Sequence, residues 1–186
     1  MWLSKNNIPN VLSLLRIILS LVFPVFIYYG LSLCAVLIFS AAALTDFLDG
    51  YLARKWNVQS SFGSKIDPLA DKILMTVSYI SLYFVGWIPF YVVLVVILRD
   101  ILILSAVVLC TFNKISVKIE PLFSSKVNTT LQIIYVIIIL SCKSFSINVP
   151  LFVDICSFIV CLSTLFSAAE YIKKYYWIKD EIRKLK

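Results

Sequence analysis

The sequence predicts an all-α integral membrane protein with six transmembrane helices and a short N-terminal interfacial helix. Of the 186 residues, 61% are hydrophobic, whereas soluble domains contain about 45–50% apolar residues. The mean hydropathy is +0.97. Because one membrane span needs about 20 mostly apolar residues, the chain has room for about six spans and little else.

Six apolar stretches define the expected helices. A window of about 19 residues finds them at residues 11–29, 33–53, 68–85, 89–110, 127–142 and 149–172. The preceding segment MWLSKNNIPN has a tryptophan, a lysine and a proline, which favours a short helix lying along the membrane surface. No small-residue cleavage site follows the first stretch, so we expect it to be retained. No repeat or linker is evident, and we expect one domain over residues 1–186.

The distribution of positive charge predicts the orientation. The net charge is +7. Lysines and arginines follow the second and fourth stretches and cluster in the last fourteen residues, KKYYWIKDEIRKLK. The opposite side carries only Lys143. The positive-inside rule therefore places both termini and residues 46–71 at the cytoplasmic, or matrix-like, face. Charges near helix ends favour anionic membrane lipids as partners and argue against nucleic acid.

Residue types missing from the chain restrict its chemistry. There is no histidine, and the five cysteines have no CxxC spacing, so the sequence gives no indication of a zinc site. We interpret the cysteines as small hydrophobic side chains. Any catalysis must then depend on carboxylates, hydroxyls, lysines and arginines.

Four aspartates stand out in DFLDGYLARKWNVQSSFGSKIDPLAD, residues 46–71. Asp46 and Asp49 are three residues apart, and Asp67 and Asp71 are four apart, so each pair shares one face of a helix. A polar turn between the pairs lets the second span reverse into the third. Four carboxylates repel one another unless cations neutralise them, and oxygen ligands suit two Mg²⁺ or Mn²⁺ ions. The segment predicts a two-metal phosphoryl-transfer site.

Neighbouring residues fit a nucleotide. Gly50 and Ala53 leave the helix surface without bulk, and the fork-shaped cation of Arg54 suits a diphosphate. The alternative for Asp67 is a helix cap before Pro68 as first helical residue. For Asp46 and Asp49 the alternative is a pair of solvated charges at a helix end, but acids inside an apolar run favour function.

The spacing Asp49-Gly50-x2-Ala53-Arg54-x8-Gly63-x3-Asp67-x3-Asp71, preceded by Asp46, resembles the complete motif of the CDP-alcohol phosphotransferase family. Eight fixed positions make a chance match on the order of 10⁻¹⁰ per window. The resemblance implies a six-helix membrane enzyme that displaces CMP from a CDP-linked lipid with an alcohol acceptor. Lipid enzymes of this build are often paired by their helices, which leaves a homodimer open.

The resemblance also implies roles for individual residues. Asp46, Asp49 and Asp67 would hold the two Mg²⁺ or Mn²⁺ ions, and Asp71 would join them and act as general base on the acceptor hydroxyl. The expected nucleotide-binding residues are Asn10, Ser13, Gly50, Ala53, Arg54 and Gly63. The expected residues for the acceptor and its phosphate are Lys65, Arg99, Lys126 and Asn128.

Residues 7–17, NIPNVLSLLRI, resemble the first helix of the branches that make phosphatidylglycerol and cardiolipin. Asn10, Ser13 and Arg16 are three residues apart and share one helix face. Helix capping is the alternative for Asn10 and Ser13. For Arg16 the alternative is snorkelling to the membrane interface.

Arg99 and Asp100 lie in an otherwise apolar span, where an unpartnered charge costs about 2.5–3.5 kcal/mol or more. Because adjacent side chains on a helix point apart, we expect the two residues to have separate partners. Arg99 faces the acceptor phosphate in the functional interpretation. The alternative is a structural ion pair to another helix.

Three segments favour one branch of the family. PLFSSKVNTTLQII, GSKIDPLADKIL and LRDILIL look most like the cardiolipin-making branch that uses CDP-diacylglycerol. Relatives that use glycerol 3-phosphate usually show Gly-Lys-x-Lys-Thr where this chain has Ser125-Lys126-Val127-Asn128-Thr129. Losing one lysine fits a phosphodiester acceptor, phosphatidylglycerol, better than a phosphomonoester with nearly two charges.

The expected reaction is therefore phosphatidyl transfer from CDP-diacylglycerol to phosphatidylglycerol, giving cardiolipin and CMP. The same chemistry with glycerol 3-phosphate, giving phosphatidylglycerophosphate, is the nearest alternative. A carrier whose acids bind a cation is another class, but transport does not require the block of Gly50, Ala53 and Arg54. A third possibility is a noncatalytic lipid-binding or assembly protein.

Overall fold

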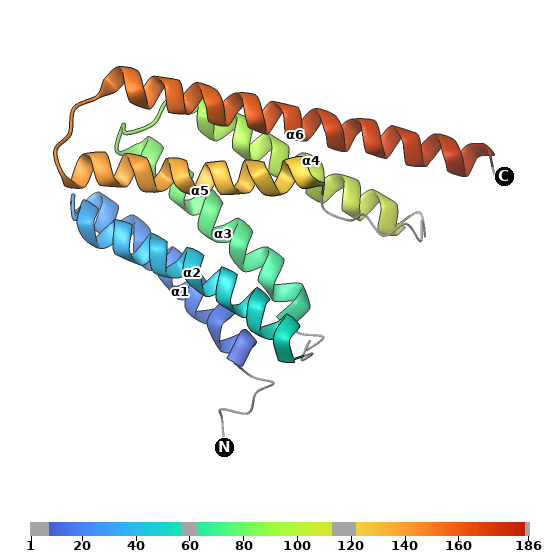
Figure 1. Cartoon of the computed structure of the whole chain (residues 1–186), viewed down its shortest axis with the longest axis horizontal. Coiled ribbons are helices and arrows are strands. Elements are labelled where there is room, and N and C mark those ends of the chain that lie inside the picture. The colour runs from blue at the N-terminus through green and yellow to red at the C-terminus, as the bar shows by residue number, and fades with distance from the viewer. Residues whose placement is uncertain (1–7, 57–62, 113–121, 185–186) are drawn as a thin grey trace. The chain divides into compact units, whose positions relative to one another are not determined.

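Helices account for the regular structure of this chain. The computed structural model describes the backbone of residues 8–56, 63–112 and 122–184, and the side chains of residues 14–45, 72–105 and 122–174. Within these ranges the chain forms only α-helices and turns, which confirms the all-α prediction (Figure 1). The helices are α1 (Ile8–Tyr28), α2 (Ser32–Trp56), α3 (Gly63–Phe84), α4 (Phe90–Phe112), α5 (Phe123–Ser144) and α6 (Pro150–Lys184). Each predicted apolar stretch falls on one of them.

Among the described residues, two helical segments are long and apolar enough to cross a membrane by length and composition. They are Phe123–Ser144 and Pro150–Lys174, with mean hydropathies of 1.5 and 2.1. Shorter apolar helical segments lie in α1, α2 and α3. The six-helix prediction is confirmed, whereas the crossing of the bilayer by all six stays a prediction. Residues 1–7 of the expected interfacial helix lie outside the described residues, and Ile8–Asn10 belong to α1.

The contacts within the chain divide it into two compact units, with the boundary inside α5. The first unit comprises Met1–Ile88 and Val136–Val149. In it α1 packs against both α2 and α3, and α2 also contacts α3. Gly30 has a φ of 70°, a left-handed conformation that ends α1 and suits glycine. The backbone N–H groups of Gly30 and Leu31 donate to the carbonyls of Ile27 and Phe26, so α1 and α2 form a tight antiparallel hairpin.

Aromatic packing consolidates the first unit. The rings of Phe23 in α1 and Phe39 in α2 lie 5.9 Å apart between centroids, and both side chains are buried. At the end of α5, the ammonium of Lys143 lies 5.8 Å from the ring centroid of Trp87, a cation–π contact.

The second unit comprises Pro89–Tyr135 and Pro150–Lys186, in which α4 packs against α6. The buried side chains of α6 recur every three or four residues, which marks one face of a helix. This face consists of Ser157, Val160, Cys161, Thr164, Ser167 and Tyr171. Half of its members carry a hydroxyl on an aliphatic side chain, so the interior of this unit is partly polar. The described cysteines, Cys34, Cys142, Cys156 and Cys161, are free thiols.

Candidate active site

The aspartate motif is distributed over two helices that contact each other. Asp46 and Asp49 lie in the second half of α2, and Asp67 and Asp71 lie in the first turns of α3. Each pair is therefore helical, which is the condition under which its spacing predicted a shared helix face. Gly50, Ala53 and Arg54 also belong to α2, and Gly63 and Lys65 to α3. The side chains of these residues lie outside the described part of the structure.

The start of α3 decides the alternative for Asp67. The helix begins at Gly63, four residues before Asp67. Asp67 therefore lies within the helix, and the interpretation of this residue as a cap ahead of Pro68 is wrong.

The first helix brings Arg16 into the interior of the same unit. Arg16 is 0% exposed, so it does not snorkel to the interface. It has a bonding or electrostatic partner in the structure, as a buried guanidinium requires. The acidic residues of the first unit are Asp46, Asp49, Asp67 and Asp71. Asn10 and Ser13 lie on α1, with side chains outside the described residues.

Arg99 makes three polar contacts that join α4, α5 and α6. Its Nη1 donates to Oδ1 of Asp100 at 2.8 Å. Its Nη2 donates to the hydroxyls of Ser125 on α5, at 2.5 Å, and Ser167 on α6, at 3.1 Å. The expectation of separate partners for Arg99 and Asp100 is wrong, because the long arginine side chain folds back over its neighbour. The ion pair is within α4, and hydroxyls rather than a carboxylate provide the contacts to other helices.

Asn128 lies at the contact between α5 and α6. Its side chain is 0% exposed. Oδ1 of Asn128 accepts hydrogen bonds from Ser163, at 2.6 Å, and Thr164, at 2.9 Å. Gln132, one turn further along α5, donates to the hydroxyl of Thr164 at 3.3 Å. The amide oxygen of Asn128 therefore bonds to α6, while Nδ2 has no hydrogen-bond partner among the described residues.

Lys126 differs from Arg99 and Asn128 in its surroundings. Its side chain is exposed, although the three residues lie in the same unit. Of the expected acceptor-binding residues whose side chains are described, Lys126 alone reaches the surface. Arg99 and Asn128 each belong to a separate hydrogen-bonded group of buried side chains, and we call the two groups together the polar network.

Sequence reasoning missed the hydroxyl residues of that network. Ser125 contacts Arg99 from α5, and Ser163, Thr164 and Ser167 contact α4 and α5 from α6. The spacing of Thr164 and Ser167, three residues apart in an apolar helix, was the available indication. Hydroxyls that recur on one face of an apolar helix are typical of hydrogen bonding between membrane helices.

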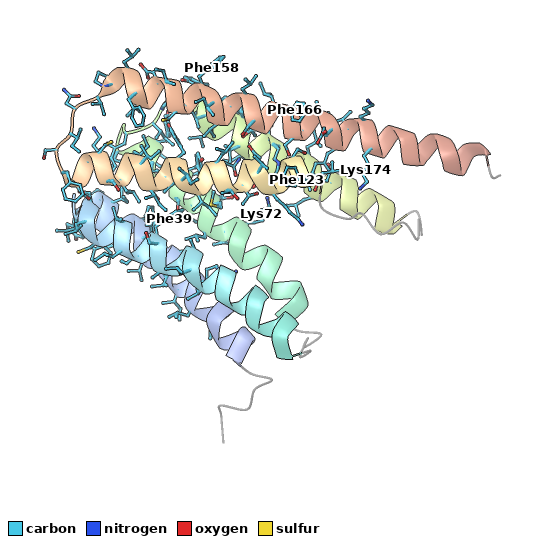
Figure 2. All side chains as sticks on the ribbon, viewed as in Figure 1. Phe39, Lys72, Phe123, Phe158, Phe166 and Lys174 are labelled. Atoms are coloured by element: carbon cyan, nitrogen blue, oxygen red, sulfur yellow. The ribbon has the colours of Figure 1, made fainter. Side chains whose placement is uncertain are left out.

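An apolar groove of about 780 Å³ lies beside this network, between α5 and α6. Phe123 and Val127 line it from α5, and Leu162 and Phe166 from α6. Figure 2 labels Phe123 and Phe166 on these two helices. These four side chains are exposed. Ser124, Ser163 and Glu170 are its polar lining residues. A groove of this composition suits a hydrocarbon chain better than a polar ligand.

The residues of the motif fit divalent metal ions. Among the side chains that the structure describes, no group of three or more histidine, cysteine, aspartate or glutamate residues lies close enough to hold a metal. The motif aspartates are carried by α2 and α3, which contact each other. Their donors are carboxylate oxygens, which Mg²⁺ and Mn²⁺ prefer.

Among the described residues there are six helices, two of them long and apolar enough to cross a bilayer, and the acidic motif lies on the contacting helices α2 and α3. Acidic residues that close an apolar helix are typical of functional sites in membrane proteins. The family model described as CDP-alcohol phosphatidyltransferase matches residues 6–169. The chain therefore belongs to the CDP-alcohol phosphatidyltransferase family. The match includes residues of both compact units.

Curated relatives include two named activities. The human cardiolipin synthase (CMP-forming) is 32% identical over 97% of this chain. A CDP-diacylglycerol–glycerol-3-phosphate 3-phosphatidyltransferase of Rickettsia felis is 33% identical over 92% of this chain and 98% of its own length. The Escherichia coli K12 protein of the same name is 43% identical over 40% of this chain. The chain spans 64% of the length of the human and rat cardiolipin synthases.

Proposed function

We propose that this protein is an enzyme that transfers the phosphatidyl group of CDP-diacylglycerol to phosphatidylglycerol, giving cardiolipin and CMP. The observation that carries the proposal is the family motif, with its aspartate pairs on the contacting helices α2 and α3. Similarity to cardiolipin synthases over 97% of the chain supports this choice of acceptor.

In the proposed reaction, Asp71 accepts the proton of the acceptor hydroxyl. The hydroxyl oxygen then forms a bond to the phosphorus that carries diacylglycerol. The bond from that phosphorus to the oxygen of CMP breaks, and CMP leaves with the electron pair. Gly50 and Ala53 leave room for the cytidine, and Arg54 stabilises the nucleotide phosphates.

Asp46, Asp49, Asp67 and Asp71 would hold two Mg²⁺ or Mn²⁺ ions. Such ions neutralise the diphosphate and the charge that develops on the leaving group. Without cations, four carboxylates on two contacting helices repel one another. The four carboxylates can therefore lie close together at low energetic cost only when cations bind to them.

The acceptor would be bound by Lys65, Arg99, Lys126 and Asn128. Arg99 already has a carboxylate partner, Asp100, so it brings less than a full uncompensated charge to a ligand. Asn128 is neutral. With Asn128 in place of a lysine, the expected pocket has one positive charge fewer, which favours an acceptor with one negative charge, as in a phosphodiester, over a phosphomonoester with nearly two.

A second candidate acceptor is glycerol 3-phosphate. It is favoured by the Rickettsia felis relative, which this chain matches over 98% of that protein's length. The chemistry at phosphorus is the same, and only the acceptor differs.

We further propose that all six helices cross the membrane, with both termini and the aspartate motif at the cytoplasmic or matrix-like face. The acyl chains of the lipid substrates would then approach from within the bilayer, while cytidine stays in water. A homodimer is the proposed assembly. Labelling of cysteines introduced next to Lys114 and next to Lys143, on opposite sides in this arrangement, tests the orientation.

Purified protein in lipid nanodiscs tests the reaction. CDP-diacylglycerol is supplied with phosphatidylglycerol or with glycerol 3-phosphate, and CMP and lipid products are measured. We expect cardiolipin and CMP with phosphatidylglycerol, and neither in Asp71→Asn. Product with glycerol 3-phosphate alone would replace the proposed acceptor with the second candidate. If neither acceptor gives metal-dependent release of CMP, the proposed enzymatic function is contradicted. The remaining alternatives are then the cation carrier and the noncatalytic lipid-binding or assembly protein.

A further inference from the structure

The guanidinium of Arg99 donates most of its hydrogens to protein partners. Arg99 is 3% exposed. Of its five N–H hydrogens, one of Nη1 goes to Asp100. Both hydrogens of Nη2 are used, because this nitrogen donates to two separate hydroxyls, those of Ser125 and Ser167. Nε has no hydrogen-bond partner among the described residues. Two hydrogens therefore remain, one on Nε and one on Nη1.

The positions of the two remaining hydrogens matter more than their number. Arginine binds a phosphate strongly through two parallel N–H groups on one edge of the guanidinium. One such edge pairs Nη1 with Nη2, and the other pairs Nε with Nη2. Each edge needs a hydrogen of Nη2. While Ser125 and Ser167 hold Nη2, neither edge of Arg99 is complete, and only single hydrogen bonds are available to a ligand.

We propose that Ser125 and Ser167 are specificity-determining residues, which restrict Arg99 to single hydrogen bonds and so select an acceptor phosphodiester over a phosphomonoester. This inference rests on the proposed function. A phosphomonoester such as glycerol 3-phosphate gains most from a forked, charge-assisted contact. Phosphatidylglycerol offers only two non-bridging oxygens and one charge, and it depends less on such a fork.

The surroundings of the two serines support a role as fixed hydroxyls. Ser167 is fully buried on the inner face of α6. Ser125 lies in the first turn of α5 and is half-buried. Asp100, which holds Nη1, fixes the guanidinium from a third direction and is itself 7% exposed. The three contacts together define the orientation of the Arg99 side chain.

Replacing either serine by alanine frees one hydrogen of Nη2, which can then bind a phosphate together with the hydrogen left on Nε or on Nη1. We expect Ser125→Ala and Ser167→Ala each to raise kcat/KM for glycerol 3-phosphate, relative to phosphatidylglycerol, about tenfold, the equivalent of one charge-assisted hydrogen bond. The change should fall on KM for glycerol 3-phosphate and not on kcat. Adding Arg99→Lys to Ser125→Ala should abolish the gain, because an ammonium has no fork.

Ser157→Ala is the matched control. Ser157 is a buried serine of the same helix, and its hydroxyl lies 2.7 Å from that of Tyr135 on α5. This variant loses a buried hydrogen bond between the same two helices but does not touch Arg99. We expect its acceptor ratio to equal that of the wild type. A shift in Ser157→Ala as large as in Ser125→Ala would overturn the inference, since any loosening of the helices would then suffice.

A binding measurement separates this inference from the proposed function. The dissociation constant of glycerol 3-phosphate is measured by calorimetry on the intact protein in nanodiscs, without CDP-diacylglycerol. We expect it to fall about tenfold in Ser125→Ala and Ser167→Ala. Equal constants in the wild type and both variants overturn the inference, even if the wild type makes cardiolipin. A wild type that releases no CMP overturns the proposed function, and the calorimetry still decides how the serines affect Arg99. Should Ser167→Ala not fold, the half-buried Ser125 provides the deciding variant.

Discussion

The hydroxyl of Thr164 donates a 2.9 Å hydrogen bond to the amide oxygen of Asn128, and both side chains are fully buried. The single hydrogen of this hydroxyl is shared with the carbonyl of Val160, and its oxygen accepts from Gln132. Thr164 therefore joins two polar side chains of α5 to α6, and Ser163 is a second link for Asn128. Loss of Thr164 takes one partner from each of two buried amides.

We expect Thr164→Val to destabilise the protein by about 1–3 kcal/mol, because the shape is kept while two buried amides lose a partner. Thermal unfolding in detergent measures the loss. Thr130→Val is the control, since Thr130 is exposed and its hydroxyl donates only to the carbonyl of Lys126 in its own helix. Equal melting temperatures for the two variants would contradict a structural role of the Asn128 contact.

We expect Arg16→Gln to destabilise the protein by about 3 kcal/mol or more, because Arg16 is 0% exposed and removal of one buried charge leaves its partner uncompensated. The carboxylates of its unit are those of the motif. If one of these aspartates is the partner of Arg16, the cost of Arg16→Gln should shrink in a background that lacks it. Arg16→Lys, which keeps the charge, is the control.

The melting temperatures of Arg16→Gln are compared in four backgrounds, each with one motif aspartate replaced by asparagine. The pair is identified by the background in which the two losses are not additive. Additive losses in all four backgrounds would show that Arg16 serves helix packing independently of the acids.

Lys126→Ala is expected to raise KM for the acceptor about tenfold, with little change in melting temperature. The side chain is exposed, so its removal costs little packing energy, whereas a phosphate loses a charged partner. Steady-state kinetics with phosphatidylglycerol measures the effect. Lys173→Ala is the matched control, because Lys173 is also an exposed lysine but lies on α6. An unchanged KM in Lys126→Ala would exclude Lys126 from the acceptor site.

Removal of divalent cations with EDTA is expected to abolish CMP release, and Mg²⁺ or Mn²⁺ to restore it. The physical reason is that the four carboxylates need cations to bind a diphosphate of the same sign. Asp46→Asn should raise the metal concentration needed for half-maximal activity, because a neutral amide is a weaker ligand. Full CMP release in EDTA would rule out the proposed cofactors.

The helices were predictable because each contains a long apolar run, and long runs indicate helices regardless of neighbouring contacts. The helical spacing of the aspartate pairs was predictable for the same reason. The partner of Arg99 was not. The rule that adjacent residues point apart describes Cβ directions, but arginine has enough rotatable bonds to return to Asp100.

The hydroxyl contacts escaped prediction for a different reason. A serine side chain reaches only one neighbour, and which neighbour depends on the rotation of α5 and α6 about their axes. The sequence shows which face carries Ser157, Thr164 and Ser167 but not what lies opposite. Asn128 was expected in the acceptor site because related chains have a lysine at this position. Its hydrogen bonds to α6 depend on how the two helices pack, which the sequence pattern does not show.

The polar contacts between α5 and α6 also bear on how the protein is made. Asn128 and Gln132 find their described partners on α6, more than thirty residues later in the chain. In the proposed membrane arrangement, α5 reaches the bilayer during synthesis before those partners exist, and amides in hydrocarbon without partners are costly. The two helices are best suited to enter the bilayer together, as a preassembled hairpin, and the short connection between Ser144 and Pro150 permits this.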